Sequence, residues 1–232
     1  MRRYLNIGNT HTQILTVDDA GERVLRTVPT DGFSQETIRN GAETFAACVV
    51  EEKTEMLRAR GVRLAAPEAA SRLVDFSRVD ASTLGQDRVA NAVYLAAKGP
   101  LPAVAFDFGT CITAEVVDEQ RRFLGGAIFP GRTLLRRALN LYTSKLPFVE
   151  LADKLPPSSG TNTADAIRMG TDAAAIDAAA GFLARLEKVL GSRPAVYACG
   201  GDRAFFLRAP ELAGMLDGGD DFTLRGVELI FT

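Results

Sequence analysis

Two short glycine-containing segments of this chain carry residue types that can bind phosphate. The first corner is residues 6–10, Asn-Ile-Gly-Asn-Thr, and the second corner is residues 107–111, Asp-Phe-Gly-Thr-Cys. Glycine between two strands lets the backbone approach a ligand closely, so amides and the hydroxyls of Thr10 and Thr110 can cradle phosphate oxygens. An acid just before such a corner can hold a metal ion or its water. Two such corners facing each other across a cleft would bind a nucleoside triphosphate.

The two corners also resemble each other in order and setting. Each has an acid or amide, an apolar residue, a glycine and a small polar residue, and Asp107 follows Asn6 by 101 positions. A repeat at about half the chain length favours two duplicated lobes over a solenoid, whose repeats are shorter. We place the lobe boundary near Gly99-Pro100, giving an N-terminal lobe of residues 1–99 and a C-terminal lobe of residues 100–232. The alternative is a chance similarity, because strand–glycine–strand corners are common.

A third segment, Gly85-Gln86-Asp87-Arg88, places an acid and an arginine at a predicted helix start. Asp87 could cap that helix, or it could act as general base for a substrate hydroxyl. Arg88 could then face a carboxylate, because its planar guanidinium matches carboxylate geometry. In a fourth segment, residues 160–167, Thr163 can cap the following helix while its neighbours line a pocket.

The elements that position these residues follow from hydrophobic periodicity and turn residues. The pattern predicts an α/β protein. Strands are expected at residues 4–7, 13–17, 22–28, 63–66, 103–106, 112–117, 123–128 and 195–198. Helices are expected at residues 34–48, 51–60, 86–98, 134–141, 163–190 (with a break) and 203–208.

Composition excludes several classes of function. The net charge is −2 and no basic stripe is present, so nucleic acid is not an expected partner. No apolar run approaches the length of a membrane span. The first residues lack the apolar stretch and cleavage site of a signal peptide, so none is expected. Three cysteines without metal-ligand spacing fit a reducing compartment, so we expect a cytoplasmic protein. His11 is the only histidine and lies within the first corner, which argues against a serine or cysteine hydrolase.

Taken together and in order, these segments resemble the type III pantothenate kinases. Residues 125–131, Gly-Gly-Ala-Ile-Phe-Pro-Gly, match the family motif in full, and the resemblance is strongest over residues 5–14 and 84–171. Residues 30–80 and the last 30 residues fit only loosely. The matching motifs are residues 6–10, 85–88, 107–113, 125–131, 146–151 and 160–163.

The resemblance implies a fold, an activity and a set of roles. The fold is that of the acetate and sugar kinase/Hsp70/actin superfamily, with duplicated actin-like ATPase (ribonuclease H-like) lobes and mixed five-stranded sheets flanked by helices. The activity is ATP- and Mg²⁺-dependent phosphorylation of pantothenate by a homodimer, the first step toward coenzyme A. Asp87 is the implied proton acceptor, and Asp107 helps to hold a monovalent cation, K⁺ or NH₄⁺. The implied ATP-binding residues are Asn6, Ile7, Gly8, Asn9, Thr10, His11, Thr12, Gln13 and Thr110, and the implied pantothenate-binding residues are Gly85, Gln86, Asp87, Arg88 and, across the dimer contact, Thr163.

Two positions depart from the family pattern. Asn6 stands where the family has aspartate, and an amide carries no charge to hold Mg²⁺ or its waters. Losing such a contact costs about 3–4 kcal/mol in the transition state, or about 10²–10³ in rate. Arg78 stands where the family often has a tyrosine that contacts substrate, so Arg78 is a further candidate substrate-binding residue.

These departures leave alternatives open. Asn6 favours a catalytically impaired homologue that binds nucleotide or pantothenate and acts as a regulatory or scaffold protein. Arg78 favours an ATPase, or a kinase with a different small hydroxy-acid as acceptor. An active pantothenate kinase remains the main hypothesis because Asp87, Asp107 and the glycine corners are intact.

Overall fold

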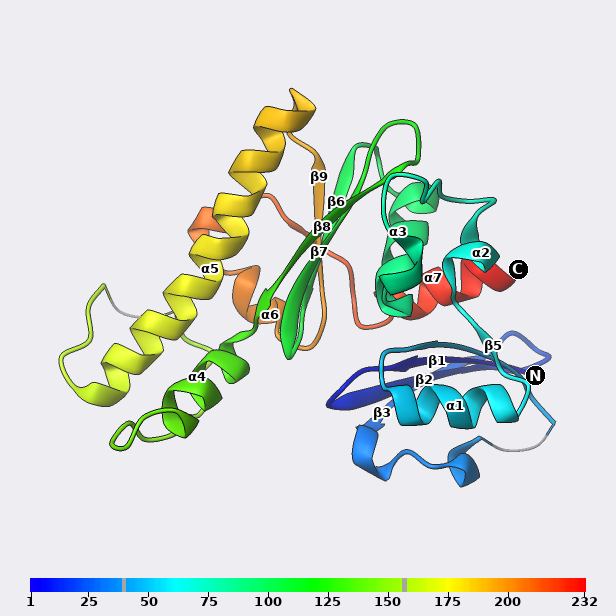
Figure 1. Ribbon diagram of the computed structural model, residues 1–232, viewed down its shortest axis with the longest axis horizontal. Helices are drawn as coiled ribbons and strands as arrows, with labels where there is room; N and C mark the ends of the chain where they lie inside the picture. Colours follow the sequence, from blue (N-terminus) through cyan, green and yellow to red (C-terminus); the bar gives the residue numbers. More distant parts are fainter. Residues whose placement is uncertain (39–40, 156–157) are drawn as a thin grey trace. The chain divides into compact units, whose positions relative to one another are not determined.

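The computed structural model describes residues 1–38, 41–155 and 158–232, which contain two five-stranded sheets flanked by helices (Figure 1). The order of strands in the first sheet is β3-β2-β1-β4-β5, and in the second it is β8-β7-β6-β9-β10. In each sheet, three strands that are consecutive in the chain lie side by side. The two later strands extend the sheet next to the earliest of the three, which is β1 in the first sheet and β6 in the second. This equivalent order confirms the predicted duplicated α/β architecture.

The first sheet is mixed. Strands β1 (Arg2–Ile7), β2 (His11–Val17) and β3 (Arg23–Pro29) are antiparallel, whereas β4 (Glu43–Cys48) runs parallel to β1 and β5 (Arg63–Leu64) runs parallel to β4. The predicted opening hairpins are therefore confirmed. The turn at Gly21 has a φ of +84°, a conformation that glycine adopts without strain.

The second sheet begins at the second corner. Its strands are β6 (Ala103–Phe108), β7 (Cys111–Val117), β8 (Phe123–Pro130), β9 (Ala195–Cys199) and β10 (Leu216–Asp217). The four predicted strands are confirmed, each slightly longer than expected at one end or both. The short β10 had no strong sequence signal, because two residues carry no alternation.

Most predicted helices are present. The helix over residues 163–190 is continuous, so the expected break is wrong. It has 28 residues, ends at Leu190 and is capped by Gly191, whose φ is +73°. The α-helices are α1 (Glu51–Ala59), α2 (Pro67–Ala70), α3 (Gln86–Lys98), α4 (Arg132–Leu141), α5 (Thr163–Leu190), α6 (Arg203–Phe206) and α7 (Phe222–Phe231). Short 3-10 helices occupy Thr30–Gly32, Gln35–Thr37, Ala81–Thr83 and Pro210–Leu212.

The prediction of a helix over residues 34–48 is wrong. Residues 39 and 40 lie outside the described residues, and Glu43–Cys48 form strand β4. Five of these six residues are buried, and Phe45 stacks on Tyr4 and Phe231. A short strand covered on both faces shows no alternation, so its apolar run cannot be distinguished from a buried helix by periodicity.

Helix α7 lies beside α3 (Figure 1). Gly226 makes the close approach possible, because a Cβ at this position would lie 2.5 Å from the Ala90 carbonyl carbon and overlap its oxygen. The C-terminal residues of the chain are thereby fixed against the helix that begins with the Gln86-Asp87-Arg88 segment.

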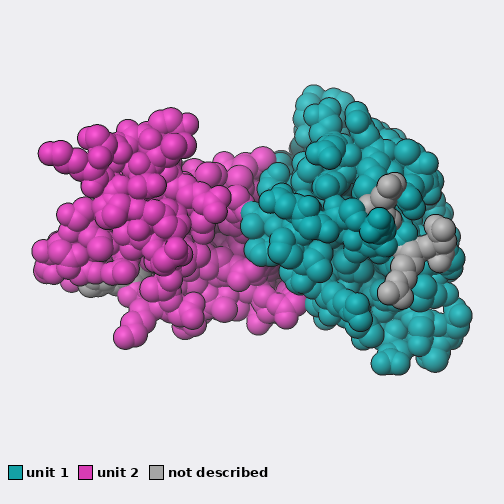
Figure 2. All heavy atoms as spheres, turned by 90° about the horizontal axis from the view of Figure 1, so that it is seen from below, with its two compact units in different colours: residues 1–103, 115–125, 221–232 teal, residues 104–114, 126–220 magenta. Residues whose placement is uncertain are grey.

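The described residues group into two compact units (Figure 2). Unit 1 contains Met1–Ala103, Glu115–Gly125 and Asp221–Thr232, and unit 2 contains Val104–Ala114 and Gly126–Asp220. These units are defined by contacts between residues, whereas the predicted lobes are defined by a duplicated segment of the chain. The division into lobes of residues 1–99 and 100–232 therefore stays a prediction. Within the described ranges, no helix is long and apolar enough to cross a bilayer.

The glycine contact between α3 and α7 gives the first prediction. Gly226→Ala should destabilise the protein by about 1–3 kcal/mol, because the added methyl group must push the two helices apart. The matched control is Gly170→Ala in α5, an exposed position where a Cβ meets no neighbour outside the helix. This change should stabilise by about 0.5–1 kcal/mol, because alanine loses less backbone entropy. Thermal unfolding followed by circular dichroism measures both; equal shifts in the two variants would refute the packing argument.

Candidate active site

The first corner is a tight hairpin between β1 and β2. The Gly8 amide donates to the His11 carbonyl oxygen at 3.0 Å, and the Thr30 hydroxyl donates to the Gly8 carbonyl oxygen at 2.7 Å. Thr12 is buried with its hydroxyl 3.0 Å from that of Thr30, whereas Thr10 and His11 are exposed. The hairpin tip is therefore held from within, and its outer residues face solvent.

Asn6 and Gln13 lie directly opposite each other on β1 and β2. The Asn6 amide nitrogen donates to the Gln13 side-chain oxygen at 3.1 Å. Both residues are half-buried, so this bond fixes two polar side chains at the base of the first corner. Asn6 and Gln13 therefore present neutral amide groups at a position where a carboxylate would carry a negative charge.

The start of α3 is tied to the strands that form this corner. The Gln86 side-chain oxygen accepts the Cys48 amide at 3.0 Å, and the Val49 amide donates to the Ile7 carbonyl oxygen at 3.1 Å. A Cβ on Gly85 would lie 3.7 Å from the Val49 side chain. The C-terminal ends of β1 and β4 and the N-terminus of α3 thus meet in unit 1. The predicted Gly85-Gln86-Asp87-Arg88 segment is brought beside the first corner.

Asp87 lies in the first turn of α3, and its Oδ1 atom accepts the Arg88 amide at 2.8 Å. The side chain keeps some solvent exposure, but protein atoms surround its carboxyl group. This burial raises the pKa of Asp87, although the amide and charge of Arg88 oppose the shift. Burial also raises the pKa of the Cys48 thiol, and the Asp87 carboxylate nearby adds to that effect. A carboxyl group held in this way is a candidate general base.

Arg88 belongs to a buried polar network that the sequence pattern did not predict. Its Nε atom donates to the Glu115 carboxylate at 2.9 Å, and Glu115 is 0% exposed. Asn91 donates to the other carboxylate oxygen at 3.2 Å and accepts from Thr223 at 2.8 Å. An acid inside the apolar strand Cys111–Val117 was the only sequence signal for it, because its partners come from distant segments.

The second corner lies in unit 2 between β6 and β7. The Gly109 amide donates to the Cys111 carbonyl oxygen at 3.0 Å, which resembles the bond that closes the first corner. Asp107, Thr110 and Cys111 are half-buried. Gly131 donates to the Thr110 carbonyl oxygen at 3.0 Å, so the start of α4 packs on this corner.

The two remaining predicted residues, Thr163 and Arg78, are exposed. Thr163 is the first residue of α5, but the cap is Asn162, whose side chain accepts the Asp165 amide at 3.0 Å. The expected capping role of Thr163 is therefore wrong, because the amide oxygen of the preceding asparagine already occupies the capping position. Arg78 lies in unit 1 ahead of the 3-10 helix Ala81–Thr83.

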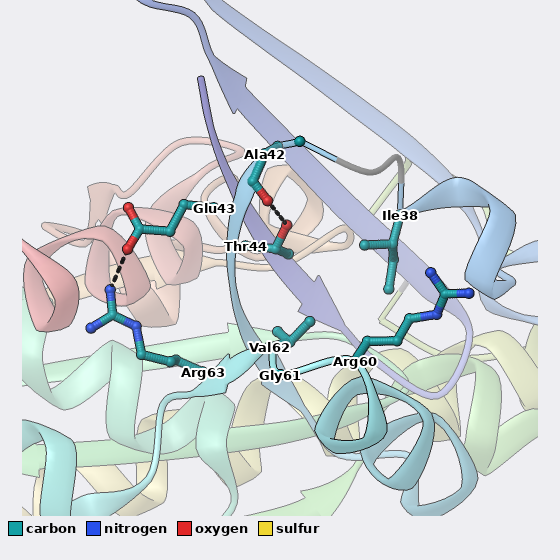
Figure 3. Close-up of a pocket in the computed structure, with 9 residues that line it drawn as sticks. Ile38, Ala42, Glu43, Thr44, Arg60, Gly61, Val62 and Arg63 are labelled. Atoms are coloured by element: carbon teal, nitrogen blue, oxygen red, sulfur yellow. Dashed lines mark hydrogen bonds and ion pairs between the residues drawn. The ribbon is translucent and has the colours of Figure 1, made fainter.

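A pocket of about 350 Å³ lies in unit 1 beside strands β4 and β5. Figure 3 shows the residues that line it. The Arg63 guanidinium donates to Glu43 at 2.7 Å, and the Thr44 hydroxyl donates to the Ala42 carbonyl oxygen at 3.1 Å. None of the residues predicted to bind ATP or pantothenate lines it. The lining residues are Ile38, Gly41, Ala42, Glu43, Thr44, Arg60, Gly61, Val62 and Arg63.

Comparison with known proteins decides the family. The sequence model of the type III pantothenate kinases matches residues 19–185. The chain belongs to this family. A type III pantothenate kinase from Akkermansia muciniphila is 39% identical over 148 residues, covering 63% of this chain and 59% of the relative. One from Desulforapulum autotrophicum is 31% identical over 167 residues, covering 71% of this chain and 62% of the relative. The chain spans about three fifths of the length of these curated relatives.

Similar solved structures support the same fold. A Baf family transcriptional activator from Campylobacter jejuni has a TM-score of 0.67 at 21% identity, covering 99% of this chain and 96% of that chain. The activator of 2-hydroxyisocaproyl-CoA dehydratase from Clostridium difficile, with bound ADPNP, has a TM-score of 0.55 at 13% identity, covering 98% and 92%. At these identities the likeness shows the fold alone, and it agrees with the predicted fold of two five-stranded sheets flanked by helices.

The raised pKa of Asp87 predicts a pH-dependent cost in stability. A carboxyl group with a raised folded-state pKa binds protons more tightly when folded. Its ionisation therefore destabilises the folded state as pH rises from the ordinary value of 3.8 through the raised pKa. Asp87→Asn should raise Tm at pH 7, and this gain should shrink as pH falls toward 3.8.

Asp80→Asn is the matched control in the same unit. Hydrogen bonds from Ser82 lower the pKa of Asp80, so its charge favours the folded state above the unfolded pKa. This variant should lower Tm at pH 7, with the loss shrinking as pH falls. A fall in Tm for Asp87→Asn at pH 7 would contradict the assigned burial cost.

Proposed function

We propose that this chain transfers the γ-phosphoryl group of ATP to the primary hydroxyl of pantothenate, giving 4′-phosphopantothenate in the first step of coenzyme A biosynthesis. Membership of the type III pantothenate kinase family supports this assignment. The observation that carries it is Asp87, whose carboxyl group has a raised pKa at the start of α3 beside the first corner. This is where a phosphoryl-transfer enzyme needs a base.

The first corner and Thr110 are the proposed phosphate-binding groups. The tip of the first corner exposes Asn9, Thr10 and His11, while Thr30 holds it from within. Backbone amides at such turns bind anions without a charged side chain. ATP is expected to enter with Mg²⁺, which usually takes few protein ligands and several phosphate oxygens. Among the described residues, no group of three or more His, Cys, Asp or Glu side chains forms a metal cluster.

Asp87 is the proposed proton acceptor. It removes the proton from the pantothenate hydroxyl as the hydroxyl oxygen bonds to the γ-phosphorus, and the bond to the β,γ-bridging oxygen breaks to release ADP. A positioned base contributes about 10²–10⁴ in rate. The raised pKa of Asp87 brings the base closer to the working pH, which favours proton transfer.

Arg88, Gly85 and Gln86 are the proposed contacts for pantothenate. Arg88 is the proposed contact for the substrate carboxylate, and the ion pair with Glu115 at 2.9 Å orients its guanidinium. Arg78, which also lies in unit 1, is a further proposed contact for the substrate. If Arg78 selects another hydroxy-acid, a panel of acceptors will show faster turnover with that acid than with pantothenate.

Asp107 is the proposed ligand for a monovalent cation, K⁺ or NH₄⁺. Its carboxylate stands at the end of β6, directly before Phe108 and Gly109 of the second corner. A hard oxygen donor at a phosphate-binding corner suits such a cation. Turnover that is equally fast in K⁺ and in a bulky organic cation would refute this role.

A homodimer is the proposed assembly, with Thr163 completing the pantothenate pocket of the second copy. Unit 2 exposes a set of large apolar side chains on and after α4 and on β8, which supports burial against another copy. They are Ile128, Leu134, Leu141, Tyr142, Phe148, Leu151 and Leu155. A monomer by light scattering at micromolar concentration would contradict this assembly. We place the protein in the cytoplasm, where this reaction and its cofactors occur.

An impaired homologue is the second candidate function, and Asn6 favours it. The Asn6 amide donates to Gln13, so this position presents no carboxylate toward a metal-bound phosphate. Such a protein would bind nucleotide and pantothenate without turnover. Activity and binding must therefore be measured separately.

The first test is a coupled kinase assay with ATP, Mg²⁺, K⁺ and pantothenate. The unaltered protein should form 4′-phosphopantothenate, and Asp87→Asn should lower kcat by about 10²–10⁴ because the base is lost. Mass spectrometry identifies the product. Ligand-induced thermal stabilisation without product would favour the impaired homologue, and product formation by both proteins at the same rate would exclude Asp87 as the base.

The second test restores the family carboxylate. Asn6→Asp should raise kcat by about 10²–10³, because a charge again stabilises the metal-bound phosphates in the transition state. Gln13 can keep its bond by donating its amide N–H to the new carboxylate. Asn6→Ala is the control for simple loss of the Gln13 bond and should not gain activity. An unchanged or lower kcat in Asn6→Asp would show that Asn6 is not the limiting departure.

A further inference from the structure

Unit 2 contains a partly buried ion pair between Arg132 and Asp202, two residues 70 positions apart in the chain. Arg132 is the first residue of α4 and is 1% exposed. Its Nε and Nη2 atoms donate to the two Asp202 carboxylate oxygens at 2.7 and 2.6 Å, and its guanidinium lies 3.4 Å from the centre of the Phe205 ring. Two parallel bonds and a stacked ring fix the plane of the guanidinium. The pair is a rigid link between α4 and the turn that follows β9.

One end of this link packs on the second corner through Gly131. The Gly131 amide donates to the Thr110 carbonyl oxygen at 3.0 Å. A Cβ on Gly131 would lie 2.7 Å from that oxygen and overlap the Gly109 carbonyl oxygen. The residue before Arg132 is therefore in direct main-chain contact with the corner.

The other end packs on the same corner through the turn at Gly200. The Asp202 amide donates to the Phe108 carbonyl oxygen at 2.9 Å. Gly200 has a φ of +87°, and a Cβ there would lie 2.6 Å from the Phe108 carbonyl oxygen and overlap the Asp107 carboxylate. The residues beside both partners of the ion pair thus contact the main chain of residues 107–110.

We infer that Arg132 and Asp202 are positioning residues of the nucleotide site. Their ion pair closes a ring of contacts around the second corner and holds Asp107 and Thr110 in the geometry that binds phosphate. The inference rests on the proposed function, in which Thr110 binds the phosphates of ATP. The inference assigns a role to two residues whose side chains do not form the corner. Asp202 contacts the corner through its backbone amide, and Arg132 contacts it through the neighbouring Gly131.

The same network offers an internal comparison. Asp172 is 1% exposed and accepts from Arg136 at 2.6 Å, whereas its contact with the Arg132 Nη1 atom is longer, at 3.4 Å. Arg136 also donates to the carbonyl oxygens of Val149 and Glu150. This part of the network ties α4 to α5 and to the segment before residue 151. Asp202, in contrast, keeps 21% of its side chain exposed and lies at the turn that contacts the corner. Replacing Asp172 removes the short bond to Arg136 but leaves both bonds between Arg132 and Asp202 in place.

The experiment measures binding of Mg-ADP by isothermal titration calorimetry, and Tm by thermal unfolding, for three variants. Asp202→Asn should weaken Mg-ADP binding by about tenfold, which is the low end of the effect of supporting hydrogen-bond partners. Arg132→Lys should weaken binding in the same way, because an ammonium cannot make two parallel bonds. Asp172→Asn should lower Tm more than Asp202→Asn does, while leaving Mg-ADP binding within about twofold of the unaltered protein.

Unchanged Mg-ADP affinity in Asp202→Asn would overturn the inference. Equal weakening in Asp172→Asn would overturn it too, because the effect would then reflect general loosening of unit 2. If the unaltered protein binds no Mg-ADP, the proposed function and the inference fall together. If it binds Mg-ADP without phosphorylating pantothenate, the proposed function fails, and the binding difference between Asp202→Asn and Asp172→Asn decides the inference by itself.

Discussion

Burial of the Asp87 carboxyl group is the constraint around which the candidate site in unit 1 is arranged. Ionised carboxylates are costly to bury, so the surrounding bonds must fix the group where it can still act. Gln86 fastens the start of α3 to β4 through the Cys48 amide, and β4 in turn pairs with β1 at the first corner. The proposed base is therefore held at a cost in stability, as is common for catalytic groups.

Unit 2 positions its corner by a different means, close contact between main chains. Gly131 and Gly200 leave no room for a Cβ, so α4 and the turn after β9 approach residues 107–110 directly. Arg132 and Asp202 then join the two approaching segments. The two glycines leave room for the close contacts, and the ion pair fixes the segments that make them. The main chain of residues 107–110 is therefore held mostly by contacts from outside the corner.

Local signals in the sequence predicted the corners, most strands and the start of α3, because glycines, alternation and helix boundaries act over a few residues. Strand β4 was mistaken for a helix because both of its faces are buried. The roles of Glu115 and Asp202 could not be predicted, since their arginine partners are 27 and 70 positions away. Long-range ion pairs depend on the folded arrangement and leave no periodic pattern in the chain. Asn6 was recognised as unusual, but its bond to Gln13 became visible only in the structure.

The central claim of the proposed function is that Asp87 must be ionised for phosphoryl transfer. The pH dependence of kcat/KM for pantothenate tests it most directly, because this profile reports the ionisation of groups in the free enzyme. The account predicts an acid limb in which kcat/KM falls as pH drops through an apparent pKa above the ordinary 3.8 of an aspartate. A profile that stays flat down to pH values near 3.8 would contradict it.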